Sequence, residues 1–132
     1  MFISRNFETA QAEIEKFAHE NCNLPADKPM KFGVVDDKIL RFACEYERAQ
    51  LVAVDNRVFL ELGNVSMTNK ENTLHIRYKF DKNADLDRFG LYLGDNILLR
   101  VDEPVLDTPE GLKKAIDRLY MAAWAIHEAC EG

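Results

Sequence analysis

Residues 89–105 read FGLYLGDNILLRVDEPV, and this stretch decides the fold class. Apolar side chains occupy alternate positions of residues 89–93, a Gly-Asp-Asn turn follows, and the apolar run 97–101 returns. Two short apolar runs around a glycine-containing turn are typical of an antiparallel β-hairpin. Because the return run begins with consecutive apolar residues, the pattern predicts that this strand is covered on both sides near its start.

Several strand patterns precede the hairpin. Residues 73–80, TLHIRYKF, alternate between an apolar face and a polar face. Residues 30–35 and 49–54 are short apolar runs, and residues 39–47 alternate between apolar and charged side chains. Each of these runs predicts a β-strand, with residues 36–38 as a turn between the first two.

The segment 58–69 allows two interpretations. It could contain a short helix, but Gly63, Val65 and Thr68 have low helix propensity. The sequence therefore favours a strand over residues 58–62.

A helix is predicted at each end of the chain. Apolar residues of the segment 7–18 recur at spacings of three and four, and Ser4 or Asn6 can cap the start of this helix. Thr108 is a good N-cap for the second helix. Pro109 then occupies the first helical position, where its missing N–H costs nothing. The core stripe of this second helix comprises Leu112, Ala115, Ile116, Leu119, Ala123 and Ile126.

The order of these elements is helix, then about five or six strands, then helix. No predicted helix separates the strands, which disfavours a parallel arrangement that needs helical crossovers. The sequence predicts one domain over residues 1–132 with an α+β fold. In this fold, a single antiparallel twisted sheet has the N- and C-terminal helices packed on one face.

The composition narrows the range of partners. The net charge of −6 and the pI near 5.1 argue against nucleic acid, because a protein that neutralises phosphates needs a basic stripe. No run of about 18 apolar residues occurs, so no membrane partner is expected, and the N-terminus lacks a secretory signal pattern. Cys22, Cys44 and Cys130 are odd in number and far apart in the chain. This predicts reduced thiols in a cytoplasmic protein rather than disulfides.

Two stretches carry side chains of the type that binds metals, but neither predicts a metal site. The acids of residues 81–87 alternate as in an EF-hand calcium loop. Leu86, however, stands where that loop needs glycine, and Tyr92 stands where it needs a bidentate glutamate. His19 and Cys22 lie three residues apart on a helix, but further zinc ligands are missing. The sequence therefore predicts no metal and no other cofactor, and residues 81–87 are interpreted as a solvated loop.

No catalytic pair is predicted either. Cys44 lies on the apolar face of its predicted strand and His75 on the polar face of its own, so the two would lie on opposite faces of a shared sheet. Asp102 and Glu103 are adjacent in a strand and would also point to opposite faces. Together with Pro104 they are expected to end the sheet and to discourage another chain from pairing there. The sequence thus favours a protein without catalytic residues.

The C-terminal helix carries a second row of large side chains beside its core stripe. Tyr120, Trp124 and His127 form this row, and Met121 lies next to it. A helix that is apolar on more than one stripe has more surface than one sheet face can bury. Because aromatic residues and methionine are common in interfaces, these four residues are predicted to bind a partner. The alternative is that Trp124 covers the edge of the core.

The C-terminal half also carries a family resemblance. Residues 90–129, GLYLGDNILLRVDEPVLDTPEGLKKAIDRLYMAAWAIHEA, are similar in layout to the ending of the type III secretion chaperone-like fold. This group includes the secretion chaperones and the YbjN-type putative sensory transduction regulators. Its members have an additional helix between the third strand and the final strands, which the segment 58–69 would have to supply. The resemblance implies a dimeric binding protein that holds an extended segment of its partner and performs no chemistry.

Three functions are consistent with these observations. The preferred hypothesis is a non-enzymatic cytoplasmic protein-binding module, chaperone-like or adaptor-like, that acts as a homodimer. The second is a small ligand-binding α+β protein or enzyme with a pocket between the sheet and the helices. The third is an immunity-type inhibitor, whose acidic surface would bind a single cationic protein tightly.

Overall fold

The computed structural model describes residues 4–30, 32–67, 72–80, 88–94, 96–102 and 106–131. Its elements are, in chain order, α1 (Phe7–Asn21), α2 (Val34–Glu45), β1 (Gln50–Val54), β2 (Arg57–Val65), β3 (Leu74–Lys79), β4 (Phe89–Leu93), β5 (Asn96–Arg100) and α3 (Pro109–Glu131). Within the described residues the strands form one five-stranded sheet in the order β1-β2-β3-β4-β5, and all neighbouring pairs are antiparallel. This confirms the predicted α+β fold with a single antiparallel sheet.

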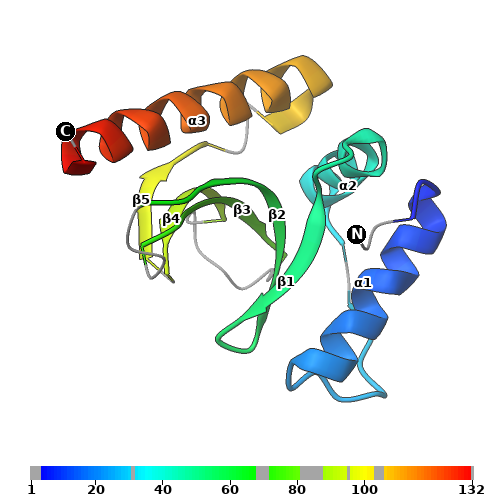
Figure 1. The fold of residues 1–132 in the computed structure, drawn as a ribbon. Helices are drawn as coiled ribbons and strands as arrows, with labels where there is room; N and C mark the ends of the chain where they lie inside the picture. The colour runs from blue at the N-terminus through cyan, green and yellow to red at the C-terminus, as the bar shows by residue number, and fades with distance from the viewer. Residues whose placement is uncertain are drawn as a thin grey trace.

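The sheet is curled, and α1, α2 and α3 lie along its outer side (Figure 1). The side chains of the sheet that point toward the helices form the core face. They include Leu51, Leu60, Ile76, Tyr78, Phe89 and Leu91, which belong to the same buried cluster as Ile14 of α1, Leu40 of α2 and Leu119 of α3. The terminal helices therefore pack on one face, as predicted. The opposite side of the sheet is called the inner face below.

Residues 34–45 form the helix α2, so the strands predicted over 30–35 and 39–47 are wrong. The buried residues of α2 are Asp36, Ile39, Leu40, Ala43 and Cys44. They recur at spacings of three and four, which is the helical period. The alternation of residues 39–47 resembled a strand because the first member of the helical stripe is a buried aspartate instead of an apolar residue. The predicted turn at 36–38 is part of the first turns of this helix.

A buried ion pair holds α2 against the sheet. Asp36 is only 1% exposed, and its Oδ1 accepts hydrogen bonds from the Tyr78 hydroxyl and the Arg88 guanidinium. Its Oδ2 accepts a hydrogen bond of 3.1 Å from the backbone N–H of Gly33, which caps the helix. The guanidinium carbon of Arg88 also lies 5.0 Å from the centroid of the Tyr78 ring. These contacts provide the partners that a buried carboxylate requires.

The predicted ends of α1 and α3 are confirmed by their caps. Asn6 is the N-cap of α1, and its Oδ1 accepts a hydrogen bond of 3.1 Å from the N–H of Thr9. Thr108 precedes α3, and its Oγ1 accepts a hydrogen bond of 3.0 Å from the N–H of Gly111. Pro109 begins α3, as the sequence predicts.

β5 is exposed, although the sequence predicted cover on both sides of this strand. Among the described strands it is the last of the sheet, with β4 as its one neighbour. Leu91 of β4 pairs with Leu99, whereas Tyr92 pairs with Ile97, so Leu98 is the additional residue of a β-bulge. Leu98 and Leu99 consequently point toward solvent instead of into a second layer.

β2 extends beyond the strand that pairs with it on one side. Asp55 and Asn56 form the tight turn between β1 and β2 with φ angles of 50° and 66°, a backbone conformation that these residue types tolerate. Pairing with β1 stops at Gln50, which lies opposite Glu61. Within the described residues, positions 63–65 of β2 therefore pair only with β3, and Leu62 falls at an irregularity of the pairing between Glu61 and Gly63. The strand also confirms the prediction for residues 58–62.

Candidate functional site

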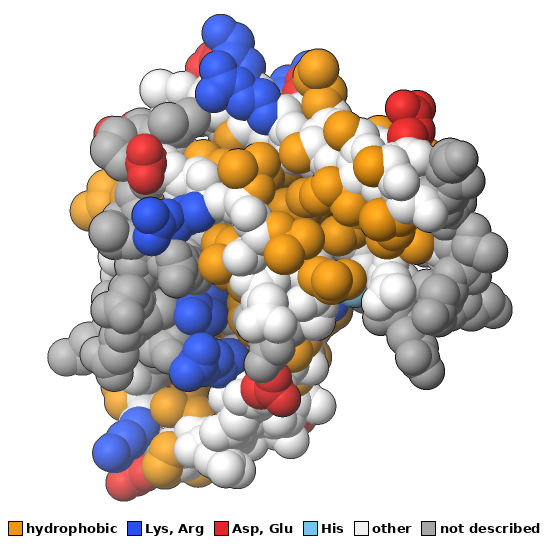
Figure 2. Space-filling view, turned by 90° about the vertical axis from the view of Figure 1, so that its left-hand side faces the viewer, with side chains coloured by type: hydrophobic (Ala, Val, Ile, Leu, Met, Phe, Trp, Pro, Cys, Tyr) orange, Lys and Arg blue, Asp and Glu red, His pale blue; other side chains and the backbone are white. Residues whose placement is uncertain are grey.

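The largest exposed apolar side chains of the C-terminal half lie on α3 and β5. Met121 and Trp124 of α3 are 74% and 51% exposed, and Leu98 and Leu99 of β5 are 47% and 44% exposed. These four residues are called the α3–β5 apolar surface. Figure 2 shows hydrophobic side chains gathered on the side of the molecule where the C-terminal half of α3 and β5 lie. Exposed apolar side chains that gather on neighbouring elements are typical of an interaction surface.

The residues that the sequence singled out on α3 differ in exposure. Met121 and Trp124 are exposed, whereas Tyr120 and His127 are half-buried. The Trp124 and His127 rings meet edge to face, with 5.1 Å between their centroids. Tyr120 packs against the sheet, so it supports the helix as well as facing a neighbouring pocket. The sequence did not predict Leu98 and Leu99 as members of the α3–β5 apolar surface, because β5 was expected to be covered on both sides near its start.

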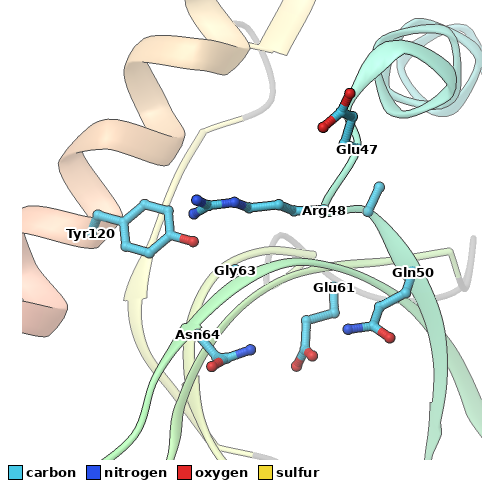
Figure 3. Close-up of a pocket in the computed structure, with 8 residues that line it drawn as sticks. Glu47, Arg48, Gln50, Glu61, Gly63, Asn64 and Tyr120 are labelled. Atoms are coloured by element: carbon cyan, nitrogen blue, oxygen red, sulfur yellow. The ribbon is translucent and has the colours of Figure 1, made fainter. Parts of the chain in front are cut away.

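A pocket of about 380 Å³ lies where β2 extends beyond β1. It is called the β2-edge pocket, and its lining residues are Glu47, Arg48, Ala49, Gln50, Glu61, Gly63, Asn64 and Tyr120. Figure 3 shows Arg48 and Tyr120 extending toward one another on one side of β2, while Gln50, Glu61 and Asn64 point to the other side. The pocket therefore has polar walls on both faces of the strand, with Gly63 between them. Its residues come from distant parts of the chain, so no local motif predicted it.

Gly63 permits the close approach of Tyr120 to β2. A Cβ atom added at position 63 would overlap the Tyr120 hydroxyl group and the ring carbon that carries it. Glycine at this position thus lets the aromatic ring lie against the strand, where it forms one wall of the pocket.

We expect Gly63→Ala to lower the free energy of unfolding by about 1–3 kcal/mol, because the Tyr120 ring must move from its packed position. Urea unfolding measures this change. The same substitution in a Tyr120→Ala background should cost much less, since the overlapping atoms are absent. Equal costs in the two backgrounds would show that Tyr120 is not what requires a glycine at this position.

The inner face of the sheet carries a buried ionic cluster next to the pocket. Glu61 Oε1 lies 2.5 Å from His75 Nδ1 and 3.1 Å from both Nε and one terminal nitrogen of Arg77. Burial raises the pKa of Glu61, but the hydrogen bonds and charges of His75 and Arg77 outweigh it, and the net pKa lies below its ordinary value. Arg77 also lies over the Phe59 ring, which packs against Tyr92. The carboxylate is therefore ionised and holds the two basic side chains in place.

This cluster contains a carboxylate that orients a histidine, an arrangement that can support a general base. Cys44 does not serve as a nucleophile for His75. Cys44 lies in the core on α2, and His75 lies on the inner face of the sheet. The two residues are thus on opposite sides of the sheet, as the sequence indicated, although Cys44 lies on a helix. Within the described residues, no three His, Cys, Asp or Glu side chains are grouped so that they could hold a metal ion.

The other residues that the sequence singled out either belong to the ends of helices and strands or lie outside the described residues. His19 Nδ1 donates a 3.0 Å hydrogen bond to the Leu24 carbonyl, and Cys22 forms the C-cap of α1. Asp102 is exposed beyond the end of β5. Residues 81–87 and the neighbours Glu103 and Pro104 are outside the described part of the chain, so their predicted roles stay predictions.

Comparisons with protein-family models, with curated proteins and with solved structures find no match to this chain. Among the described helices, none is long and apolar enough to cross a membrane.

Proposed function

We propose that this chain is a non-enzymatic protein-binding module, chaperone-like or adaptor-like, that works in the cytoplasm as a homodimer. The observation that carries the proposal is the α3–β5 apolar surface. Its side chains come from a helix and from an edge strand, and its members include a tryptophan and a methionine. Tryptophan is enriched among the residues that dominate binding energy, and methionine adapts to irregular partners.

A second copy of the chain is the proposed occupant of this surface. In a two-fold dimer the same patch lies on both subunits, so an uncharged apolar patch is complementary to itself. β5 contributes Leu98 and Leu99 to the patch, and one of its sides is unpaired among the described strands, so two copies could also extend their sheets. The net charge of −6 makes two copies repel one another, so added salt should strengthen the dimer by screening this repulsion.

The cytoplasmic location is supported by the state of the thiols. Cys22, Cys44 and Cys130 are free cysteines, and Cys130 is exposed. Exposed free thiols persist in reducing compartments and are uncommon in secreted proteins. The type III secretion chaperone-like resemblance implies the same kind of dimeric binding protein, although residues 57–65 form the strand β2 where that fold has its additional helix.

Trp124→Ala should weaken self-association by at least about tenfold, because the substitution removes a large side chain from both halves of the interface. Sedimentation over a range of protein concentrations measures this effect. The melting temperature should change by less than about 3 °C, since Trp124 is half exposed in the single chain. Leu99→Lys should give the same loss of association from the β5 side of the surface.

Val34→Ala is the matched control, because Val34 is an exposed apolar residue on α2, outside the α3–β5 apolar surface. It should leave association unchanged. A chain that remains a monomer at all concentrations would contradict the homodimer. A large drop in melting temperature for Trp124→Ala, with association unchanged, would place Trp124 in the core instead. Capture of a single tight cationic protein would favour the immunity-type inhibitor.

The second candidate function is a ligand-binding protein with a pocket between the sheet and the helices. The β2-edge pocket favours it, because the pocket is lined by Tyr120 of α3 and by residues of β2.

A further inference from the structure

The β2-edge pocket lies at the stretch of β2 that has no partner strand on the side of β1. Gly63 and Asn64 of this stretch line the pocket, whereas Leu62 and Val65 are buried. β1 stops opposite Glu61, so the backbone groups of residues 62–65 that face this side have no strand partner among the described residues. An unpaired strand edge accepts another extended chain through main-chain hydrogen bonds. At about 3.3 Å per residue, positions 62–65 are as long as about four residues of a guest strand.

The topology sets the direction in which a guest strand would lie. β1 runs antiparallel to β2 and begins at Gln50. A guest strand that is also antiparallel to β2 would lie in line with β1 and run toward its first residue. Antiparallel pairing is slightly more stable per residue than parallel pairing. The C-terminal end of the guest would therefore lie beside the turn that carries Arg48 and Ala49.

Arg48 supplies the charge that a chain terminus at this position requires. Its side chain is exposed and forms no ion pair and no hydrogen bond within the described part of the chain. Figure 3 shows the guanidinium group extending toward Tyr120, whereas the carboxylate of Glu47 points away from it. Glu61, the other acid of the pocket, is already paired with Arg77 and lies beside His75. An arginine without a partner is well suited to a carboxylate, which it can bind through two hydrogen bonds.

The remaining walls match the other parts of an extended peptide. Gln50 and Asn64 are exposed amides that can donate to and accept from peptide groups. Tyr120 lies over Gly63 and offers an aromatic surface for a guest side chain. The volume of about 380 Å³ lies within the range of about 300–1,000 Å³ that is usual for small-ligand sites.

We propose that the β2-edge pocket binds the C-terminal end of an extended peptide. The terminal carboxylate binds Arg48, and the preceding residues pair with β2 at Gly63 and Asn64, which line the pocket. The site is separate from the α3–β5 apolar surface, so it does not require the homodimer.

Two peptide pools test the proposal. Both contain N-acetylated tetrapeptides of mixed sequence, and they differ only in ending with a free carboxylate or an amide. Each pool is titrated into the isotope-labelled full chain while the backbone amide resonances are followed by NMR. We expect the free-acid pool to shift the resonances of residues 62–65 and to bind at least about tenfold more tightly than the amide pool, because amidation removes the charge that faces Arg48. The difference should decrease with added salt.

Substitutions inside and outside the β2-edge pocket show whether the peptides bind at this pocket or elsewhere on the chain. Arg48→Gln should remove the advantage of the free-acid pool, whereas Arg57→Gln, an exposed arginine at the far end of β2, should retain it. Trp124→Ala should leave peptide binding unchanged, so failure of the dimer and failure of this site are distinguishable.

Equal binding of the two pools would overturn the proposal, as would the absence of shifts at residues 62–65. N-acetylglycine alone provides a carboxylate without a strand. If it binds as tightly as the tetrapeptides, pairing with the β2 edge is overturned, and the pocket is a site for small carboxylates.

Discussion

Asp36→Asn should lower the free energy of unfolding by about 3–5 kcal/mol, the largest loss that we expect from a single substitution in this protein. The carboxylate is almost fully buried and accepts hydrogen bonds from Tyr78, Arg88 and the backbone of Gly33. The asparagine is similar in size but carries no charge, so the largely buried Arg88 guanidinium loses its ion pair with Asp36. Such a loss is a large fraction of the 5–15 kcal/mol that is typical of a whole domain. Urea unfolding followed by circular dichroism measures the change.

A double-mutant cycle tests whether the loss comes from this network. Tyr78→Phe removes only the hydroxyl that donates to Asp36, and it should cost less in the Asp36→Asn background than in the native chain. Asp117→Asn is the matched control, because Asp117 is exposed on α3, and its cost should stay within about 0.5 kcal/mol. Additive costs for Asp36→Asn and Tyr78→Phe would show that the two side chains do not act together.

Glu61→Gln should lower the free energy of unfolding by about 3 kcal/mol at neutral pH. Glu61 is buried on the inner face, and its removal leaves the buried Arg77 without a counter-charge. Because the pKa of Glu61 is lower in the folded chain than its ordinary value of about 4.3, the carboxylate stabilises the fold fully above that ordinary value. The stabilisation is then lost as the pH falls through the lower folded pKa. The difference in stability between the native chain and Glu61→Gln should therefore shrink below about pH 4.3.

Urea unfolding at a series of pH values between about 7 and 3 measures this dependence. Glu47→Gln is the matched control, since Glu47 lines the same pocket but is exposed, and its effect should be small at every pH. A constant difference between the native chain and Glu61→Gln across the whole pH range would contradict the lowered pKa of this residue.

The sequence predicted the elements whose signals are local. The alternation of residues 73–80 and the turn of the 89–105 hairpin predicted β3, β4 and β5 correctly, because period-two patterning and turn chemistry depend on neighbouring residues. The ends of α1 and α3 were also predicted, since a cap is a contact between residues that are three positions apart. α2 was missed because its helical stripe contains a buried charge, and that charge is stable only beside Tyr78 and Arg88.

The candidate sites were predicted only in part. The second row of α3 was visible in the sequence, and Trp124 of that row is exposed, as is the adjacent Met121. Leu98 and Leu99 were assigned to a covered strand, because an apolar run does not reveal whether its strand is central or at an edge. The β2-edge pocket left no local signal, since Arg48, Gly63 and Tyr120 are far apart in the chain.

The sequence by itself determined the antiparallel sheet, the two terminal helices and the aromatic row on α3, because each follows from periodicity, turn residues or caps within a short segment. Only the tertiary structure decided which strand lies at the edge, where β1 stops along β2, and which charges are buried together. These features depend on contacts between distant segments, such as Glu61 with Arg77 and Asp36 with Arg88, and on the curl of the sheet under the helices. A short stretch of sequence contains only one partner of each such contact, and the fold supplies the other.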